Sequence, residues 1–258
     1  ALRLYILNNN FNLSFVDFSL AHYFSNGLNL LIPFRLGEAI RYILIVRIIK
    51  KPTDALIMII IERASDFSTI FLVLIFLYFF SINNSSIFFS LILISILCII
   101  FLLTIIFFLS YPLKKFKGEL SHKFYFIYIK SLFRFLENMR DGIKNVSSNL
   151  SNRKAIFLHL SVIIWLLEAS VFYILINDYE KDIFIILTVF VYSVLSTFLP
   201  SGPAGIGGIQ LAFFYVATSG VFDIPLELSF VYIISTFVPS IILTIIIYPF
   251  IKRVIYEK

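Results

Sequence analysis

Long apolar runs are the feature that most constrains how this chain can fold. An α-helix needs roughly 20 apolar residues to cross the hydrocarbon core of a bilayer. Four runs exceed that length, and they are Thr53–Phe80, Ile87–Leu113, Ala155–Ile176 and Leu228–Ile251. The chain is 60% hydrophobic and only 14% charged, which is unlike a soluble globular domain. The sequence therefore predicts an all-α polytopic membrane protein.

Basic residues are concentrated in the connection formed by residues 114–153. Between Leu113 and Ala155 there are ten Lys and Arg against three Asp and Glu, and loops rich in Lys and Arg stay in the cytoplasm. The uncharged loop Ser81–Ser86 and the net acidic loop Asn177–Asp182 suit the outside. We therefore expect a multi-pass plasma-membrane protein whose 114–153 loop and C-terminus are cytoplasmic. The net charge of +6 follows from this distribution and does not indicate nucleic-acid binding.

Apolar residues within this connection recur at close to helical spacing between residues 124 and 143. With Lys and Arg between them, they predict a basic amphipathic helix. Such a helix either lies on the anionic inner leaflet or packs on the bundle as a connector, and the sequence leaves both open. We assign the connector to a single transmembrane domain formed by residues 1–258.

Two further apolar regions, residues 14–49 and 183–221, are interrupted by helix-breaking residues. The second arm of the first region, residues 37–49, would span only about 20 Å as a helix, so each region predicts a broken or re-entrant hairpin. The breaks lie around residues 33–41 and 199–208. Their turn residues are Pro33, Gly37, Pro200, Gly202, Pro203, Gly205, Gly207, Gly208 and Gln210.

The two predicted hairpins have opposite orientations, because the first begins and ends inside and the second begins and ends outside. Each is followed by a span, which predicts an inverted-topology repeat of the kind in which transporters place substrate sites near the bilayer midplane. Only Ala1–Leu7 precedes the first hairpin. We expect this segment to be the inner end of a helix whose remainder lies upstream, with Arg3 on the cytoplasmic side.

Arg35, Glu38 and Arg41 lie beside the first break and are three residues apart. This spacing places them on one helical face, where Glu38 can pair with either arginine and one positive charge is left over. The free N–H groups at the start of the short helix point to the same place. The combination predicts a binding site for an anionic group such as a lipid phosphate.

A second charged cluster, Glu62, Arg63 and Asp66, lies in the middle of a predicted span, and Glu168 lies similarly deep in another. Ionisable residues at this depth normally face the bundle interior and have partners. We group Arg63 with the headgroup-binding arginines. The acids can balance the arginines, hold a broken helix as static ion pairs or carry protons, and the sequence leaves these alternatives open.

Residues that could bind a metal, form a disulfide or act in catalysis are isolated from suitable partners in the sequence. His22, His122 and His159 have no second ligand at a workable spacing, so we expect no metal site. Cys98 is the single cysteine, so no disulfide can form within the chain. A nucleophile paired with a base and a glycine-rich phosphate loop are also missing. We expect no cofactor and no enzymatic activity.

Three motifs resemble a known family. The runs Asn29–Arg47, Glu62–Asp66 and Phe198–Phe214 are similar to the lysylphosphatidylglycerol synthase transmembrane region, also called the flippase-like membrane domain family. Its members show Pro-x-Arg-x-Gly-Glu-x-x-Arg, then Glu-Arg-x-x-Asp, then a Pro-Gly-Gly-x-Gly-type turn followed by Glu. The third motif is partial here, since Ala204 replaces a Gly and Gln210 replaces the Glu. The residues that match are Pro33, Arg35, Gly37, Glu38, Arg41, Glu62, Arg63, Asp66, Pro203, Gly205 and Gly207.

The resemblance implies a membrane domain that moves anionic phospholipid or polyprenyl-phosphate-linked lipid between leaflets. Some members carry a soluble aminoacyl-tRNA-dependent transferase and others a glycosyltransferase, but the 258 residues contain neither. Two alternatives stay open. One is a non-transporting module that anchors or supplies lipid to a separate transferase, and the other is an ion-coupled solute transporter. The sequence is compatible with a homo-oligomer.

Overall fold

The computed structural model describes residues 1–8, 13–32, 36–80, 96, 137–146, 148, 150, 153–197, 205–218 and 225–256. Every regular element in these residues is a helix, as predicted. The predicted span Ile87–Leu113 lies outside the described residues, apart from Ile96.

The N-terminal half consists of α1 (Leu2–Leu7), α2 (Phe15–Leu31), α3 (Leu36–Ile49) and α4 (Pro52–Phe80). The Ser14 side chain accepts a hydrogen bond from the backbone N–H of Val16 and so caps α2. The first predicted hairpin is thus α2 and α3, and the predicted span Thr53–Phe80 is α4.

The C-terminal half consists of α7 (Lys154–Ile176), α8 (Ile183–Ser196), α9 (Gly208–Thr218) and α10 (Glu227–Tyr256). The Asp182 side chain caps α8 in the same way as Ser14 caps α2. The second predicted hairpin is α8 and α9, and α7 and α10 are the predicted spans on either side of it.

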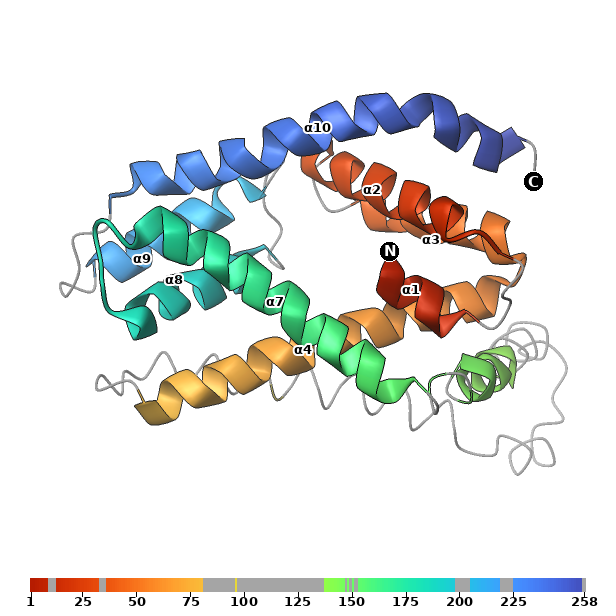
Figure 1. Cartoon of the computed structure of the whole chain (residues 1–258), viewed down its shortest axis with the longest axis horizontal. Helices are drawn as coiled ribbons and strands as arrows, with labels where there is room; N and C mark the ends of the chain where they lie inside the picture. Colours follow the sequence, from red (N-terminus) through yellow and green to blue (C-terminus); the bar gives the residue numbers. More distant parts are fainter. Residues whose placement is uncertain are drawn as a thin grey trace, which may run out of the picture.

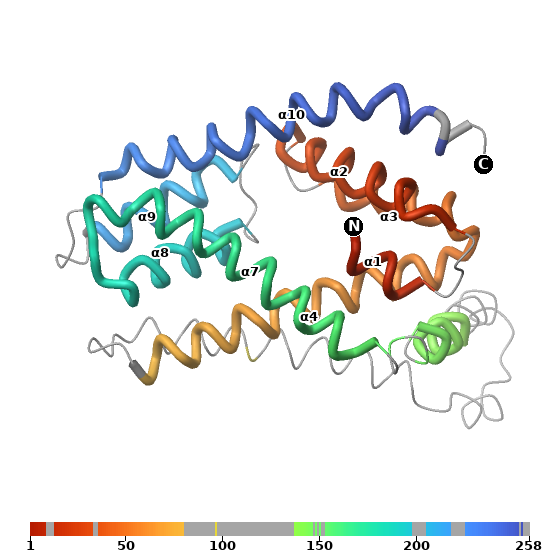
Figure 2. Tube along the Cα trace, in the orientation of Figure 1, coloured from red at the N-terminus to blue at the C-terminus, as the bar shows by residue number. Residues whose placement is uncertain are grey.

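The two hairpins enter the molecule from opposite ends (Figure 1). The first hairpin, α2 and α3, extends from the right end to the centre and back, whereas α8 and α9 extend from the left end to the centre and back. The long helices α4, α7 and α10 run the length of the molecule beside them, as the Cα trace also shows (Figure 2). This arrangement is the inverted pair of broken hairpins that the sequence predicts.

Each hairpin has its own hydrophobic core. The core of α2 and α3 includes Phe18 and Ile45, which pack with α1, the first half of α4 and the end of α10. The core of α8 and α9 includes Phe190 and Phe213, which pack with α7, the second half of α4 and the start of α10. The long helices therefore join two separately packed halves.

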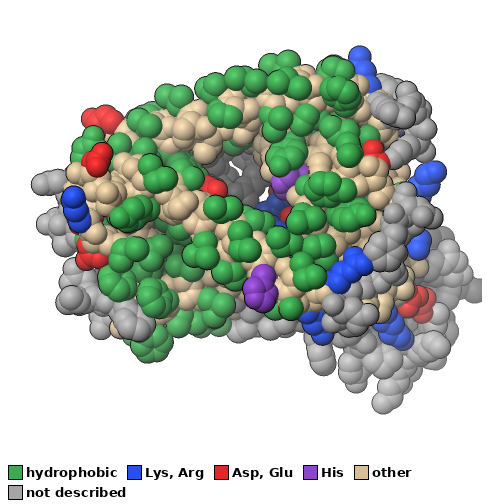
Figure 3. Space-filling view, viewed as in Figure 1, with side chains coloured by type: hydrophobic (Ala, Val, Ile, Leu, Met, Phe, Trp, Pro, Cys, Tyr) green, Lys and Arg blue, Asp and Glu red, His purple; other side chains and the backbone are tan. Residues whose placement is uncertain are grey.

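The outer faces of α7 and α10 are apolar and exposed. An 18-residue stretch within each of residues 154–176 and 227–252 has a mean hydropathy of 2.1 and 2.4, respectively, and only 17% of each stretch is buried. Apolar side chains also cover most of the face shown in Figure 3, and most of the Lys and Arg visible there lie at the right end. Burial of such faces in lipid removes them from water, as befits a membrane protein.

The described part of the basic connector, residues 137–146, is helical and packs on the bundle. Met139 and Val146 are buried in the core of the first hairpin. A Cβ atom at Gly142 would lie 2.5 Å from Ile57 Cδ1 of α4. Of the two interpretations of the connector, packing on the bundle applies to this part. Residues 114–136 of the connector lie outside the described residues.

Candidate functional site

Six charged side chains from α1, α3 and α4 form a closed ring of ion pairs inside the molecule. Positive and negative charges alternate around it, and the three arginines and three carboxylates balance one another. In order, the members are Arg3, Glu62, Arg41, Glu38, Arg63 and Asp66.

The inner side of the ring is buried. Arg3 Nη1 lies 2.6 Å from Asp66 Oδ1, and Arg3 Nη2 lies 3.3 Å from Glu62 Oε1. Arg41, which is 0% exposed, donates to Glu62. A charge at this depth is tolerated because opposite charges surround it. Each of these side chains has two oppositely charged neighbours in the ring.

The outer side of the ring is reachable, because Arg63 and Glu38 are about one-third exposed. Their side chains are 31% and 27% exposed, and Arg63 Nη2 lies 2.5 Å from Glu38 Oε1. Arg63 Nη1 lies 3.3 Å from Asp66 Oδ2 and so completes the ring. The face of the molecule is hollowed near its centre, with charged and histidine side chains in view among apolar ones (Figure 3).

Arg41 has unused hydrogen-bonding capacity on the side of this exposed edge. Its Nη1 lies 3.5 Å from Glu38 Oε2, too far and too poorly aligned for a hydrogen bond. Its Nε is likewise buried without an acceptor among the described residues. Buried guanidinium N–H groups without an acceptor are costly. A ligand with several acceptor atoms could satisfy them.

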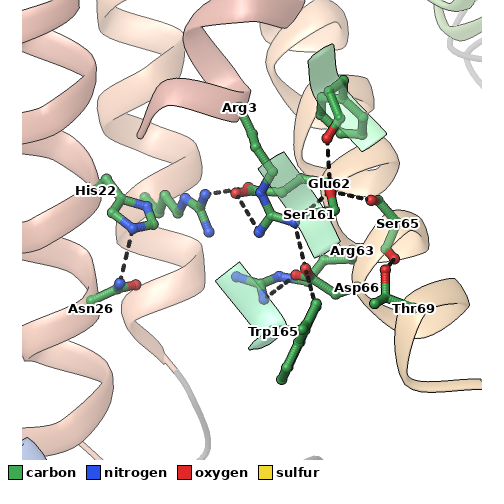
Figure 4. A network of polar contacts seen from close by, with 12 residues as sticks. Arg3, His22, Asn26, Glu62, Arg63, Ser65, Asp66, Thr69, Ser161 and Trp165 are labelled. Carbon is green, nitrogen blue, oxygen red and sulfur yellow. Dashed lines mark hydrogen bonds and ion pairs between the residues drawn. The ribbon is translucent and has the colours of Figure 1, made fainter. Parts of the chain in front are cut away.

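Helix α7 supports the ring from the other side (Figure 4). Ser161 accepts a hydrogen bond from Arg3 at 3.2 Å and lies 2.6 Å from the Ser65 hydroxyl. The indole N–H of Trp165 donates to Asp66 Oδ1 at 3.2 Å. These contacts fix the rotation of α7 against α4. The sequence analysis missed both residues, although Trp165 and Ser161 lie on the same helical face as Glu168.

Arg3 is buried in the ring and not at a free helix end, and its expected place on the cytoplasmic side stays a prediction. The residue is 8% exposed and lies inside the ring, because α1 carries it inward from Leu7 by about 6 Å at 1.5 Å per residue. Its long side chain extends the reach further. One signal was present in the sequence: four intramembrane acids faced only three arginines, which left room for one more cation.

Glu168 lies apart from the ring. Its carboxylate accepts a hydrogen bond from the Tyr232 hydroxyl at 2.6 Å, and neither Arg3 nor Arg41 reaches it. Among the described residues Glu168 thus pairs with a hydroxyl and has no ion pair with Arg41 or Arg63, whereas Arg35, the third arginine that it was expected to balance, lies outside the described residues. Whether it carries a proton stays a prediction.

The described part of the second break is a glycine turn stabilised by Gln210. Gly205 and Gly207 have φ angles of +78° and +91°, which L-residues rarely adopt. The Gly207 N–H donates to Gln210 Oε1 at 2.6 Å. The amide at the position where the family commonly has a Glu thus holds the turn.

Tight backbone packing occurs at the first turn of both returning helices. A Cβ atom at Gly37 of α3 would lie 2.3 Å from the Ser25 carbonyl oxygen of α2. One at Gly208 of α9 would lie 2.9 Å from the Ser196 carbonyl oxygen of α8. Five other predicted site residues, Pro33, Arg35, Pro200, Gly202 and Pro203, lie outside the described residues.

Comparison with known proteins identifies the family. Comparisons with curated proteins and with solved structures gave no match. The model of one protein family, the lysylphosphatidylglycerol synthase TM region, matches residues 1–247 and so covers the ring, both hairpins and nearly the whole chain. The chain therefore belongs to the family of the lysylphosphatidylglycerol synthase TM region.

Proposed function

We propose that this protein translocates an anionic lipid between leaflets and that the lipid phosphate binds at the exposed edge of the charge ring. The observation that carries the proposal is the pair of unsatisfied N–H groups of Arg41 behind the partly exposed Arg63 and Glu38. A phosphate supplies several strong acceptor oxygens and pairs well with guanidinium groups. The name of its family refers to a phosphatidylglycerol derivative, a lipid that contains a phosphate group, and so supports a phospholipid as the ligand.

The ring can bind the phosphate without leaving an arginine unpaired. The phosphate replaces the Glu38 carboxylate as the partner of Arg63 and Arg41, so that opposite charges still alternate. Glu38, near the start of α3, is the ring carboxylate with the greatest exposure and can turn toward water. The inner pairs, Arg3 with Asp66 and Arg41 with Glu62, stay in place.

The two opposed hairpins offer a way for the lipid to move between leaflets. The facing ends of α2 and α3 and of α8 and α9 lie near the middle of the molecule (Figure 1), and transporters of inverted topology place their sites near the bilayer midplane. We propose that α2–α3 and α8–α9 open in turn toward opposite leaflets, with the end that carries Lys50 and Lys51 in the cytoplasm. We place the protein in the plasma membrane. In this proposal the chain itself performs no acyl or glycosyl transfer.

Reconstitution tests the proposal. Protein in liposomes is supplied with fluorescent phosphatidylglycerol, and dithionite quenching measures how fast the lipid changes leaflets. Arg63→Gln is expected to slow this movement at least about tenfold, equivalent to ~1.4 kcal/mol of barrier. Lys51→Gln, which removes a charge that is 69% exposed, serves as the matched control and is expected to leave the rate unchanged. Fluorescent phosphatidylcholine tests headgroup selectivity.

Two outcomes contradict the proposal at different levels. If wild-type protein moves neither phosphatidylglycerol nor a fluorescent polyprenyl phosphate faster than empty liposomes do, translocation is wrong. A non-transporting module that supplies lipid to a separate transferase then becomes the better explanation. If Arg63→Gln and Lys51→Gln transport lipid equally fast, translocation stands and the assignment of the binding site is wrong.

A further inference from the structure

A second polar site lies in the other half of the molecule, in a cavity of about 190 Å³ between α7, α8, α9 and α10. Most of its wall is apolar. Its lining residues are Ile164, Trp165, Glu168, Ser193, Val194, Thr197, Ile209 and Tyr232. None of them is basic, so the Glu168 carboxylate gives the cavity a negative charge that no lining residue neutralises.

Oxygen atoms in the cavity are available to a cation. Glu168 uses one carboxylate oxygen to accept from Tyr232, and the Tyr232 hydroxyl oxygen can itself still accept or coordinate. The hydroxyl of Ser193, a residue only 1% exposed, has no hydrogen-bond partner among the described residues. A buried hydroxyl without a partner is costly, and it indicates that this wall is built to contact a ligand.

The position of the cavity in the fold adds to its negative potential. Ser193 belongs to the last turn of α8 and Thr197 is its C-cap, and the C-terminal end of a helix carries a partial negative charge. Helices that end inside a membrane protein at a break present this end to coupling cations. The cavity thus combines a carboxylate, two hydroxyl oxygens and a helix C-terminus.

We propose that this cavity binds a small monovalent cation, for which sodium is the probe. All the donor atoms are oxygens, as a hard cation prefers, and such an ion needs neither His nor Cys. The single carboxylate balances one positive charge. A divalent ion would leave an excess charge in an apolar interior, which is strongly unfavourable.

Trp165 connects this cation site to the charge ring. Its ring lines the cavity, while its N–H donates to Asp66. Ser161, Trp165 and Glu168 lie on one face of α7, so one helix contacts both sites. A cation bound beside Glu168 therefore shifts the environment of Trp165, which is the only tryptophan in the chain.

Intrinsic fluorescence of Trp165 tests the proposal directly. The full chain in detergent, with no lipid probe, is titrated with sodium chloride at fixed pH, and choline chloride maintains the ionic strength. We expect a saturable fluorescence change with sodium. Glu168→Gln is expected to raise the half-saturating sodium concentration at least about tenfold, because it removes the charged ligand. Ser193→Ala is expected to raise it about threefold.

Matched controls keep the test specific. Glu227→Gln makes the same chemical change at an exposed position, and Ser170→Ala does so for Ser193. Both are expected to titrate like the wild type, and circular dichroism checks the fold of each variant. Binding of radioactive sodium should follow the same order of variants.

Several results would overturn the sodium site. One is a wild-type response that is equal for sodium and choline, and another is a Glu168→Gln protein that is folded and titrates like wild type. A response to pH alone would mean that Glu168 carries a proton instead. The titration needs no lipid movement, so its failure and the failure of the proposed translocation are distinguishable.

Discussion

At the scale of single residues, the closed ring explains how six charges coexist in the interior of a membrane protein. An isolated buried pair gains little net stability, because desolvation offsets the attraction. In the ring each charge faces two opposite charges, as Glu62 does between Arg3 and Arg41. Removing one member leaves two like charges beside the gap. The ring should therefore tolerate single substitutions poorly.

Glu62→Gln tests this sensitivity. The substitution leaves the buried Arg3 and Arg41 without their shared carboxylate, and we expect a loss of about 3 kcal/mol of unfolding free energy. Denaturant unfolding in detergent, followed by circular dichroism, measures it. The double variant Arg41→Gln with Glu62→Gln should lose less than the two single losses together. A Glu62→Gln protein as stable as Lys51→Gln would show that the ring contributes nothing to stability.

At the scale of helices, glycine determines how closely each hairpin closes. Both returning helices place a glycine in their first turn against a backbone carbonyl of the outgoing helix: Gly37 against Ser25 and Gly208 against Ser196. A further close contact joins the halves, since a Cβ atom at Gly27 of α2 would lie 1.6 Å from Thr244 Oγ1 of α10. Side chains at these positions would separate the helices.

Gly37→Ala and Gly207→Ala distinguish close packing from backbone conformation. The methyl group at position 37 meets a backbone oxygen at 2.3 Å, whereas a Cβ atom at Gly207 has nothing within 4 Å and only its φ of +91° opposes the change. We expect Gly207→Ala to cost about 1–2 kcal/mol and Gly37→Ala more. Thermal unfolding of both in detergent makes the comparison. Equal losses would mean that α3 can move away from α2 without cost.

At the scale of the whole molecule, the two hairpins define two ends. Lys51 lies at the end from which α2 and α3 enter, and Asp178 lies at the end from which α8 and α9 enter (Figure 1). The long apolar faces of α7 and α10 connect these ends. We therefore expect the protein to cross the bilayer along the axis through both ends.

Cysteine labelling tests this orientation. In a Cys98→Ser background, Asp178→Cys should react with a membrane-impermeant maleimide added to intact cells. Lys51→Cys should react only after the cells are permeabilised, because that end is expected in the cytoplasm. Leu166→Cys, at a position on α7 that is 64% exposed, should resist labelling in both cases because lipid covers it. Labelling of positions 51 and 178 from the same side would contradict the inverted arrangement.

Helices and breaks were predictable from the sequence because their causes are local. Apolar length predicted α4, α7 and α10 to within a few residues, and Gly and Pro predicted where each hairpin reverses. The motif residues Glu38 and Arg41, and in a separate cluster Glu62, Arg63 and Asp66, were also identified from the sequence, because few side chains in such spans are ionisable. That the two clusters join in one ring was not predicted.

Partners of those charges were decided by the tertiary structure alone. Arg3 and Asp66 are 63 residues apart in sequence, and Trp165 and Asp66 are 99 apart. Hydropathy predicts that a helix crosses the membrane, but it fixes neither the rotation nor the depth of that helix against its neighbours. Those two quantities depend on side-chain packing between helices. The rotation and depth of the helices bring Arg3 into the ring and place Glu168 beside Tyr232, in a separate cavity.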